Sequence, residues 1–275
     1  MADHAHNLRA PTGAGASRGR PFGVITRGTT GFNRLRRSDR WAFYHPRVSS
    51  LIRGRPAPLA VDVGYGASFT TTVEWSRWLR RLNPNVEVVG LEIDPERVLP
   101  PRDGVRFELG GFELAGYRPD YVRAFNVLRQ YDVDQVDMMW HEVCSRLAPG
   151  GLFLEGTCDE IGRRAAWVLL DEGGPLTLTL AWDPFDVERP SDVAERLPKK
   201  LIHLNRPGEK IHDLLQSADA AWDRAASWEP YGPRIRWRQA RELLIAEGVQ
   251  LHPQRRPIRD NILTVDWALV APDII

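Results

Sequence analysis

Short apolar runs alternate with helical repeats through the middle of the chain. The run LAVDV at 59–63 is followed by a turn with glycine at alternate positions, and then by a segment at 75–82 in which tryptophan and leucine recur at helical spacing. Further apolar runs lie at 86–93, 105–109, 121–125 and 152–154, and a second helical repeat lies at 133–147. Strands that alternate with helices in this way predict an α/β fold with a doubly wound, Rossmann-like, mostly parallel sheet.

The pattern changes after residue 156. Two apolar runs flank Glu172-Gly173-Gly174, which predicts a β-hairpin with a glycine turn. Helical stretches follow, and the apolar run at 262–270 predicts an antiparallel last strand. We therefore expect a core formed by residues 59–159 and 235–275, with residues 160–234 as a hairpin and helical insert after the fifth strand.

The residues before the sheet divide into two parts. Residues 1–20 contain almost no large apolar side chains, so they cannot offset the entropy of ordering, and we expect a disordered basic tail. Between Phe32 and Tyr44 the apolar side chains recur at helical spacing. We therefore expect a helical arm within residues 21–58.

The composition excludes several classes of protein. The chain has 275 residues, of which 43% are hydrophobic and 27% charged, values typical of a soluble globular protein. No stretch approaches the ~20 apolar residues that cross a bilayer, and no apolar signal core is present, so we expect a cytoplasmic protein without membrane association. Cys144 and Cys158 are too few for a disulfide framework or a thiolate zinc cluster, and we expect no metal.

The net charge of +1 conceals an asymmetry. Residues 1–60 hold eleven arginines against Asp3 and Asp39, so the rest of the chain is acidic. Such an arm can attract the phosphates of a nucleic acid or of a small ligand, or it can simply be solvated. Arg34 and Arg37, three positions apart on one predicted helix face, are candidates to meet an anionic ligand as a pair.

A glycine turn and an acidic residue form the strongest candidate binding site. Gly64 and Gly66 follow the first strand and let the backbone approach a ligand closely, while the next helix offers unpaired N–H groups at its start. Glu92, 28 positions beyond Gly64 at the end of the second strand, can accept hydrogen bonds from both hydroxyls of a ribose. Together they favour a nucleotide-like ligand, although a glycine turn also serves tight packing alone.

These segments resemble the class I S-adenosylmethionine-dependent methyltransferases. VDVGYGAS is similar to that family's first motif, GLEIDPERV to its second, and LAPGGLFLEGT to its turn into the fifth strand; Ser68 departs from the pattern, because a third glycine is usual there. The resemblance implies S-adenosylmethionine as the cofactor. The residues it implies are Asp62, Gly64, Tyr65 and Gly66 at the methionine half, Glu92 on the ribose, Ile93, Gly111 and Phe112 at the adenine, and Asn126 beneath the sulfonium.

The resemblance also implies a methyltransferase, for which we expect a small-molecule acceptor held on the side of the insert. The candidate acceptor contacts are Asp183, His203, Asn205, Arg34 and Arg37. One alternative is an RNA methyltransferase whose basic arm binds phosphates, and another is a protein that binds the cofactor without catalysis. The sequence identifies no catalytic base, because transfer from a sulfonium requires mainly positioning.

Several motifs of related enzymes are absent. The chain lacks the GxGxxG spacing of nicotinamide enzymes and the [DN]PP[YF] motif of nucleic-acid amino-methyltransferases. Cys158 stands where some RNA cytosine methyltransferases keep a nucleophile, but the Pro-Cys pair that accompanies it there is missing. We therefore expect Cys158 to be a small buried side chain.

Overall fold

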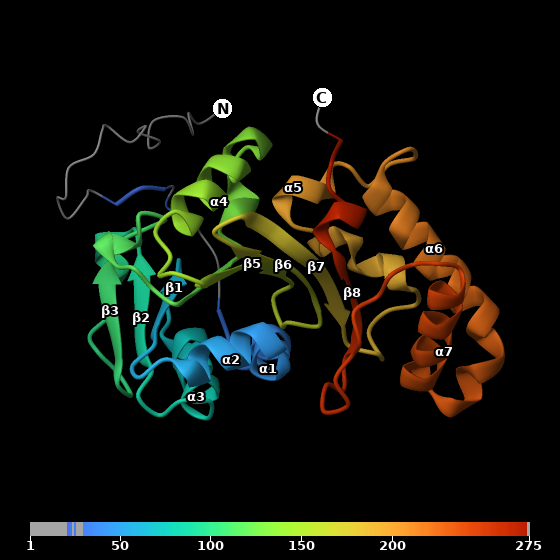
Figure 1. Ribbon diagram of the computed structural model, residues 1–275, viewed down its shortest axis with the longest axis horizontal. Helices are drawn as coiled ribbons and strands as arrows, with labels where there is room; N and C mark the ends of the chain where they lie inside the picture. Colours follow the sequence, from blue (N-terminus) through green and yellow to red (C-terminus); the bar gives the residue numbers. More distant parts are fainter. Residues whose placement is uncertain (1–20, 24, 26–29, 274–275) are drawn as a thin grey trace.

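One eight-stranded sheet forms the centre of the molecule (Figure 1). The computed structural model describes residues 21–23, 25 and 30–273. The strands are β1 (Leu59–Val63), β2 (Glu87–Glu92), β3 (Val105–Leu109), β4 (Tyr121–Phe125), β5 (Leu152–Cys158), β6 (Arg164–Asp171), β7 (Gly174–Trp182) and β8 (Asn261–Asp266). Their order across the sheet is β3-β2-β1-β4-β5-β6-β7-β8.

Strands β1 to β5 form a parallel half of the sheet. β1 pairs with β2 on one side and with β4 on the other, β3 continues from β2, and β5 continues from β4. This order is that of a doubly wound fold, in which the direction of winding reverses between β1 and β4. The reversal leaves a crevice at the carboxyl ends of these two strands, and the predicted fold class is confirmed.

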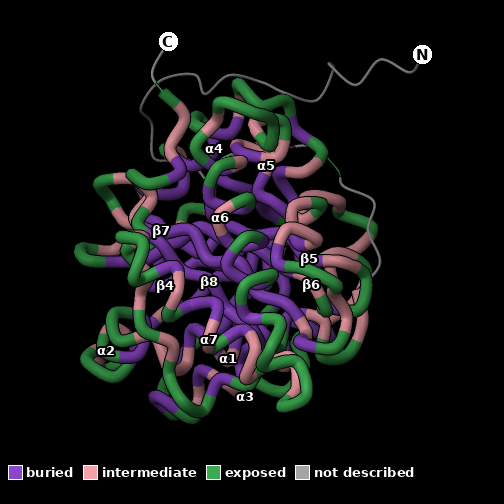
Figure 2. The backbone as a smooth tube through the Cα atoms, turned by 90° about the vertical axis from the view of Figure 1, so that its right-hand side faces the viewer, coloured by how far each residue is buried: buried purple, intermediate pink, exposed green. Residues whose placement is uncertain are grey.

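Helices cover both faces of the sheet. On one face lie α1 (Arg36–Tyr44), α2 (Pro46–Gly54) and α3 (Thr70–Arg80), and on the other α4 (Val136–Cys144), α5 (Lys199–Ile202), α6 (Lys210–Arg224) and α7 (Pro233–Ala246). Short 3-10 helices are η2 (Pro95–Arg97), η3 (Leu114–Gly116), η4 (Leu128–Gln130), η5 (Val133–Gln135), η6 (Pro190–Arg196), η7 (Ala225–Tyr231) and η8 (Trp267–Leu269). Figure 2 shows the buried sheet enclosed by more exposed helices. Over the described residues, no helix combines the length and apolar character needed to span a bilayer.

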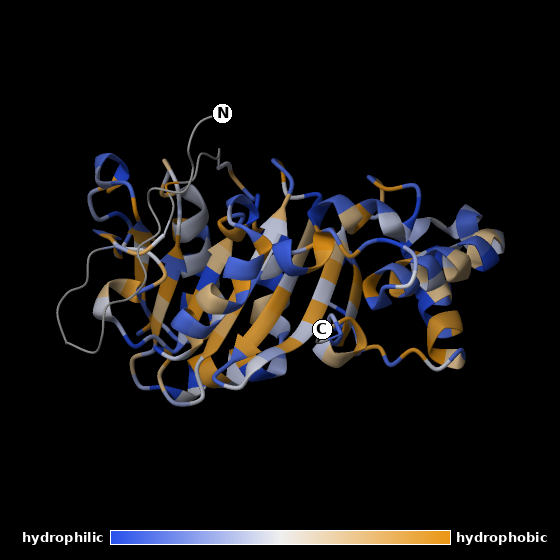
Figure 3. Cartoon of the chain, turned by 90° about the horizontal axis from the view of Figure 1, so that it is seen from above, coloured by the Kyte–Doolittle hydropathy of each residue, from blue (hydrophilic) through white to orange (hydrophobic). Residues whose placement is uncertain are grey.

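The predicted hairpin forms, but it belongs to the sheet. β6 pairs antiparallel with β5, β7 with β6, and β8 with β7, so both hairpin strands lie inside the sheet and not in a separate insert. The reason is their burial, since β6 is covered on both faces along nearly its whole length. Figure 3 shows these strands as apolar as their parallel neighbours. What lies outside the sheet after β7 is the helical segment from η6 to α7.

The outer edge of β8 is covered by α7 and the loop after it. Trp237 Nε1 and Arg241 on α7 donate hydrogen bonds to the backbone carbonyl of Ile262, at 3.1 and 3.2 Å. The backbone N–H of His252 donates to the carbonyl of Thr264 at 2.9 Å. The carbonyls that β8 turns away from β7 are therefore already bonded.

Glu155 places a carboxyl group in the core between β5 and α4. Its side chain is buried, and neither oxygen has a hydrogen-bond partner in the described part of the chain. Burial raises the pKa of Glu155 to about 8, and the nearby Trp140 indole opposes that rise only in part. The group is therefore mainly a neutral acid at pH 7.

We expect Glu155→Gln to stabilise the protein at high pH. The pKa is raised in the folded protein from the ordinary 4.5 to about 8, so the wild-type protein loses stability as the pH rises between these two values, and the loss levels off above about 8. The amide carries no charge, so its advantage in unfolding free energy should grow from near zero at pH 5 to on the order of 3 kcal/mol at pH 9. Denaturant melts across this range measure it, with the exposed Glu172→Gln as control. A difference that does not change with pH would contradict the argument.

Candidate functional site

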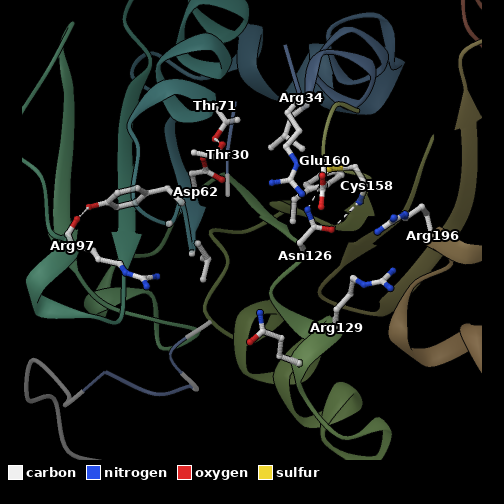
Figure 4. A pocket seen from close by; sticks show the side chains of 17 residues that line it. Thr30, Arg34, Asp62, Thr71, Arg97, Asn126, Arg129, Cys158, Glu160 and Arg196 are labelled. Atoms are coloured by element: carbon white, nitrogen blue, oxygen red, sulfur yellow. Dashed lines mark hydrogen bonds between the residues drawn. The ribbon is translucent and has the colours of Figure 1, made fainter. Parts of the chain in front are cut away.

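A cavity of about 780 Å³ opens at the carboxyl ends of β1 and β4 (Figure 4). Its walls come from the glycine turn after β1, the ends of β4 and β5, and residues 30–35 before α1. Its position is the crevice at which doubly wound folds bind ligands. Its volume suits a ligand of cofactor size.

The glycine turn is shaped by its backbone. Gly64 and Gly66 both have positive φ, 70° and 77°, which glycine adopts without strain. A Cβ on Gly64 would lie 2.6 Å from a methyl carbon of Val127, so this position has no room for a side chain. The N–H of Gly64 donates to the Leu91 carbonyl at 2.8 Å, which ties the turn to β2.

Glu92 is buried at the end of β2 and lies beside the turn. One of its carboxylate oxygens accepts from the N–H of Gly66 at 2.9 Å, and the other accepts from Ile93 and Asp94 at 3.0 and 3.2 Å. The carboxylate therefore fixes both the turn and the end of β2. Glu92 does not line the large cavity; it borders a second cavity of only about 20 Å³.

The small cavity holds the residues expected at the adenine and at the ribose. Glu92, Ile93, Gly111 and Phe112 line it, and Gly64 borders both cavities. A volume of about 20 Å³ accommodates one water molecule, far less than a purine. The expected cofactor residues are therefore adjacent, but the adenine end is nearly filled.

The backbone of Phe22 fills that end. The N–H of Phe112 donates to the Phe22 carbonyl at 3.1 Å, and the Phe22 N–H donates to a carboxylate oxygen of Glu113 at 2.7 Å. A Cβ on Gly111 would lie 2.3 Å from the Phe22 oxygen, so the close approach requires glycine there. Phe112 and Glu113 thus present one donor and one acceptor, the pair that complements N1 and the amino group of adenine.

Asp62 lines the large cavity, but its carboxylate is engaged from within. The Arg123 guanidinium, on β4, holds both Asp62 oxygens at 3.0 and 2.6 Å, and Thr72 donates to one of them at 2.8 Å. Arg123 also binds Asp39 on α1 at 2.6 Å, and its side chain is completely buried. Burial raises the pKa of Asp39 to about 7, although Arg123 acts against that rise. This buried triad joins α1 to the wall of the cavity.

Asn126 and Cys158 meet at the floor of the cavity. Asn126 has a positive φ of 63°, which asparagine tolerates better than most residues. Its amide nitrogen donates to Cys158 Sγ at 3.3 Å, and its oxygen accepts from the Cys158 N–H at 2.9 Å. Burial raises the pKa of the Cys158 thiol, so it remains protonated at neutral pH. This geometry does not activate Cys158 as a nucleophile.

Among the described residues, four arginines line the large cavity, and the sequence prediction included only one of them. Arg34 was predicted, whereas Arg97, Arg129 and Arg196 come from η2, η4 and η6. Arg34 donates to the Asp159 carbonyl at 2.9 Å, and Arg97 pairs with Asp94 at 3.3 Å. Nothing in the sequence near Arg196 marks it, because its place in the site depends on how η6 packs against the sheet.

The other predicted acceptor contacts lie outside the cavity. Arg37 is buried and pairs with Asp183 at 2.8 Å and with Asp260 at 3.4 Å, so it does not join Arg34 at the site. Asn205 contacts His212 at 3.1 Å on the surface, and His203 is exposed. The expected pairing of Arg34 with Arg37 fails because Arg37 meets the acidic residues of distant segments. Of the remaining predicted residues, Tyr65 lines the cavity but turns its hydroxyl to the Arg97 carbonyl at 2.9 Å.

In the described part of the basic arm, four arginines pair with acidic residues of other segments. Besides Arg37, Arg40 pairs with Asp260, Arg47 with Asp171 and Arg55 with Asp120. These pairs explain why an acidic remainder accompanies the arginines. The expected tail, residues 1–20, lies outside the described residues. Among the described residues, no three His, Cys, Asp or Glu side chains are placed to hold a metal ion.

Comparisons with known proteins return structures alone, since no protein-family model and no curated protein matches the chain. It is similar to magnesium protoporphyrin IX methyltransferase ChlM from Synechocystis PCC 6803, solved with bound SAH, at 15% identity and a TM-score of 0.33 over 50% of this chain and 64% of that one. It is also similar to the CcbJ methyltransferase from Streptomyces caelestis, at 18% identity and a TM-score of 0.31 over 52% and 65%. A third similar structure is the cyclopropane synthase MmaA2 from Mycobacterium tuberculosis, at 20% identity and a TM-score of 0.29 over 40% of this chain and 41% of that one. The chain covers less than two thirds of each of these structures.

Proposed function

We propose that this protein is an S-adenosylmethionine-dependent methyltransferase that acts on a small molecule. The observation that carries the proposal is the arrangement at the β1–β4 crevice, where a glycine turn and Glu92 adjoin an adenine-complementary pair, the Phe112 N–H and the Glu113 carboxylate. The 780 Å³ cavity continues from the turn to Asn126, which gives an acceptor access beside the cofactor.

The residues of the site fit the cofactor in part. In this proposal Glu92 would bind the ribose and the pair at 112–113 the adenine, whose ring would take the position that the Phe22 backbone now holds against Gly111. Asp62 is the departure: with Arg123 on its carboxylate, we assign it to fixing β1 and not to the cofactor's amino group. The helical segment from η6 to α7 is the proposed acceptor-side part of the chain.

Methyl transfer requires the protein mainly to position the acceptor, and proton transfer by a side chain is less important. When bound, S-adenosylmethionine would supply a methyl group already activated by its sulfonium, so the chain would have to hold the acceptor's lone pair in line with that group and leave any acceptor proton a path to water. Asn126, held by Cys158, shapes the floor on which the acceptor lies. The protonated thiol of Cys158 takes no part in bond formation.

Calorimetry with S-adenosylmethionine, its demethylated product and NAD tests the proposal. We expect heat from the first two and none from NAD. Glu92→Gln should weaken both by ~1 to 3 kcal/mol, because a charged acceptor is lost from the ribose site. Melting curves of the variant control for the backbone contacts of Glu92. No heat with either cofactor form at high protein concentration would defeat the proposal.

Release of labelled methyl groups separates the remaining alternatives. Transfer to fractions of small metabolites supports the proposal, whereas binding without transfer to any acceptor favours a non-catalytic cofactor-binding protein. Among the described arginines of the arm, Arg37, Arg40, Arg47 and Arg55 are paired within the chain, which leaves them less able to bind the phosphates of RNA. A steep salt dependence of RNA binding would favour RNA as the methyl acceptor.

A further inference from the structure

Two arginines that the sequence did not reveal stand side by side in the large cavity. Arg129 lies on η4, directly after β4, and Arg196 ends η6. Figure 4 shows both guanidinium groups reaching into the same part of the cavity, next to Asn126 and Cys158. Arg196 is fixed through its backbone, because the buried Thr157 hydroxyl on β5 donates to its carbonyl. The pair is therefore built by the fold and does not depend on free surface side chains.

Over the described residues, the positive charge of this pair is incompletely balanced. Two carboxylates line the same cavity, but Asp62 is bonded to Arg123 and Glu160 lies on the side of Arg34 (Figure 4). Arg129 donates to the backbone carbonyl of Glu195 at 3.1 Å, a neutral partner. Arg196 lies 3.4 Å from the Glu195 carboxylate, which is about half exposed and lies at the same distance from Arg164. Burial lowers the pKa of Arg129 most, and the neighbouring charge of Arg196 lowers it further, whereas Glu195 acts against the shift. An anion between them would relieve that repulsion.

The position of the pair separates it from the expected adenosine site. Glu92, Gly111 and Phe112 line the small cavity, whereas Arg129 and Arg196 line the far part of the large one, beside Asn126. We propose that the acceptor is an anionic small molecule whose carboxylate or phosphate group is bound by Arg129 and Arg196. That the bound anion is a methyl acceptor rests on the proposed methyltransferase function. The anion site itself rests on the geometry of the two arginines alone.

Inorganic phosphate and malonate, titrated at constant ionic strength into the full-length protein saturated with the demethylated cofactor, serve as probes. We expect at least one of them to bind, and the tighter one shows whether the site prefers phosphate or carboxylate. Arg129→Gln with Arg196→Gln should weaken that binding at least tenfold, and Arg196→Gln alone should weaken it measurably. Arg77→Gln, at an exposed arginine away from the cavity, is the matched control. Equal anion affinity in the double variant and the control, or no binding of either probe, would overturn the inference.

Cofactor affinity decides between the remaining explanations. The demethylated cofactor carries its own carboxylate, so the inference requires the double variant to keep wild-type affinity for it, and a tenfold loss would reassign the pair to the cofactor. Short RNA that binds more tightly than phosphate and depends on both arginines would overturn the small-molecule part. Anion binding without any cofactor binding would leave the anion site standing while the proposed function fails.

Discussion

Replacement of Arg123 by methionine is expected to lower the unfolding free energy by about 3 to 5 kcal/mol, the largest effect predicted for a single residue of this protein. The guanidinium is completely buried between Asp62 and Asp39. Methionine fills a similar space but leaves two carboxylates facing each other without a counter-charge. The pKa of Asp39 is already raised to about 7, so the loss should be greater at pH 8 than at pH 5, where protonation removes part of the repulsion.

Denaturant melts of three related variants separate the charge from the packing. Arg123→Lys keeps the charge but loses the two-pronged contact, and we expect an intermediate loss. Adding Asp39→Asn and Asp62→Asn to Arg123→Met should restore much of the stability, because no buried charge is then unpaired. A loss below about 1 kcal/mol for Arg123→Met would show that the triad is not a stabilising centre.

Deletion of residues 1–23 is expected to raise the affinity for S-adenosylmethionine roughly thirtyfold, since the ligand no longer displaces Phe22. Opening the adenine end of the intact protein breaks the hydrogen bonds from Phe112 to Phe22 and from Phe22 to Glu113, together worth about 2 kcal/mol. Deletion of residues 1–20 removes the basic tail but leaves these contacts, and serves as the control. Calorimetry on both truncations measures the difference.

A further substitution checks that the gain comes from the adenine end. In the chain that lacks residues 1–23, Glu113→Gln should weaken adenosine and the cofactor alike, because the acceptor for the adenine amino group is lost. Equal affinities in the two truncated proteins would mean that Phe22 does not compete with the ligand.

The sequence predicted those parts of the site that depend on neighbouring residues. Gly64 and Gly66 follow a buried strand directly, and Glu92 ends the next one, so the strand order brings them together. The partners of Asp62 were not predictable in this way. Arg123 is an unremarkable charge inside an apolar run, and its contact with Asp39 depends on the position of α1 over the sheet. A motif in the sequence therefore suggested a ligand contact where the fold places an internal ion pair.

The hairpin shows a similar limit. Apolar runs predicted both strands and their turn correctly. The sequence pattern of β6 and β7 would be the same in a separate hairpin as in strands of the main sheet. Their inclusion depends on β5 and β8 pairing on either side. The pair of arginines in the large cavity was missed for the same reason, because Arg129 and Arg196 come together only through the packing of η6 against β5.

The covered edge of β8 has a consequence for association between copies of the chain. An edge strand with free backbone groups is a template on which another strand can add, and a long apolar edge strand left exposed is a site of aggregation. Here the bonds from Trp237, Arg241 and His252 use the outward carbonyls of Ile262 and Thr264. Detachment of α7 would therefore expose the edge of β8 to other copies of the chain. Substitutions that weaken the packing of α7 should cause aggregation before they reduce ligand binding.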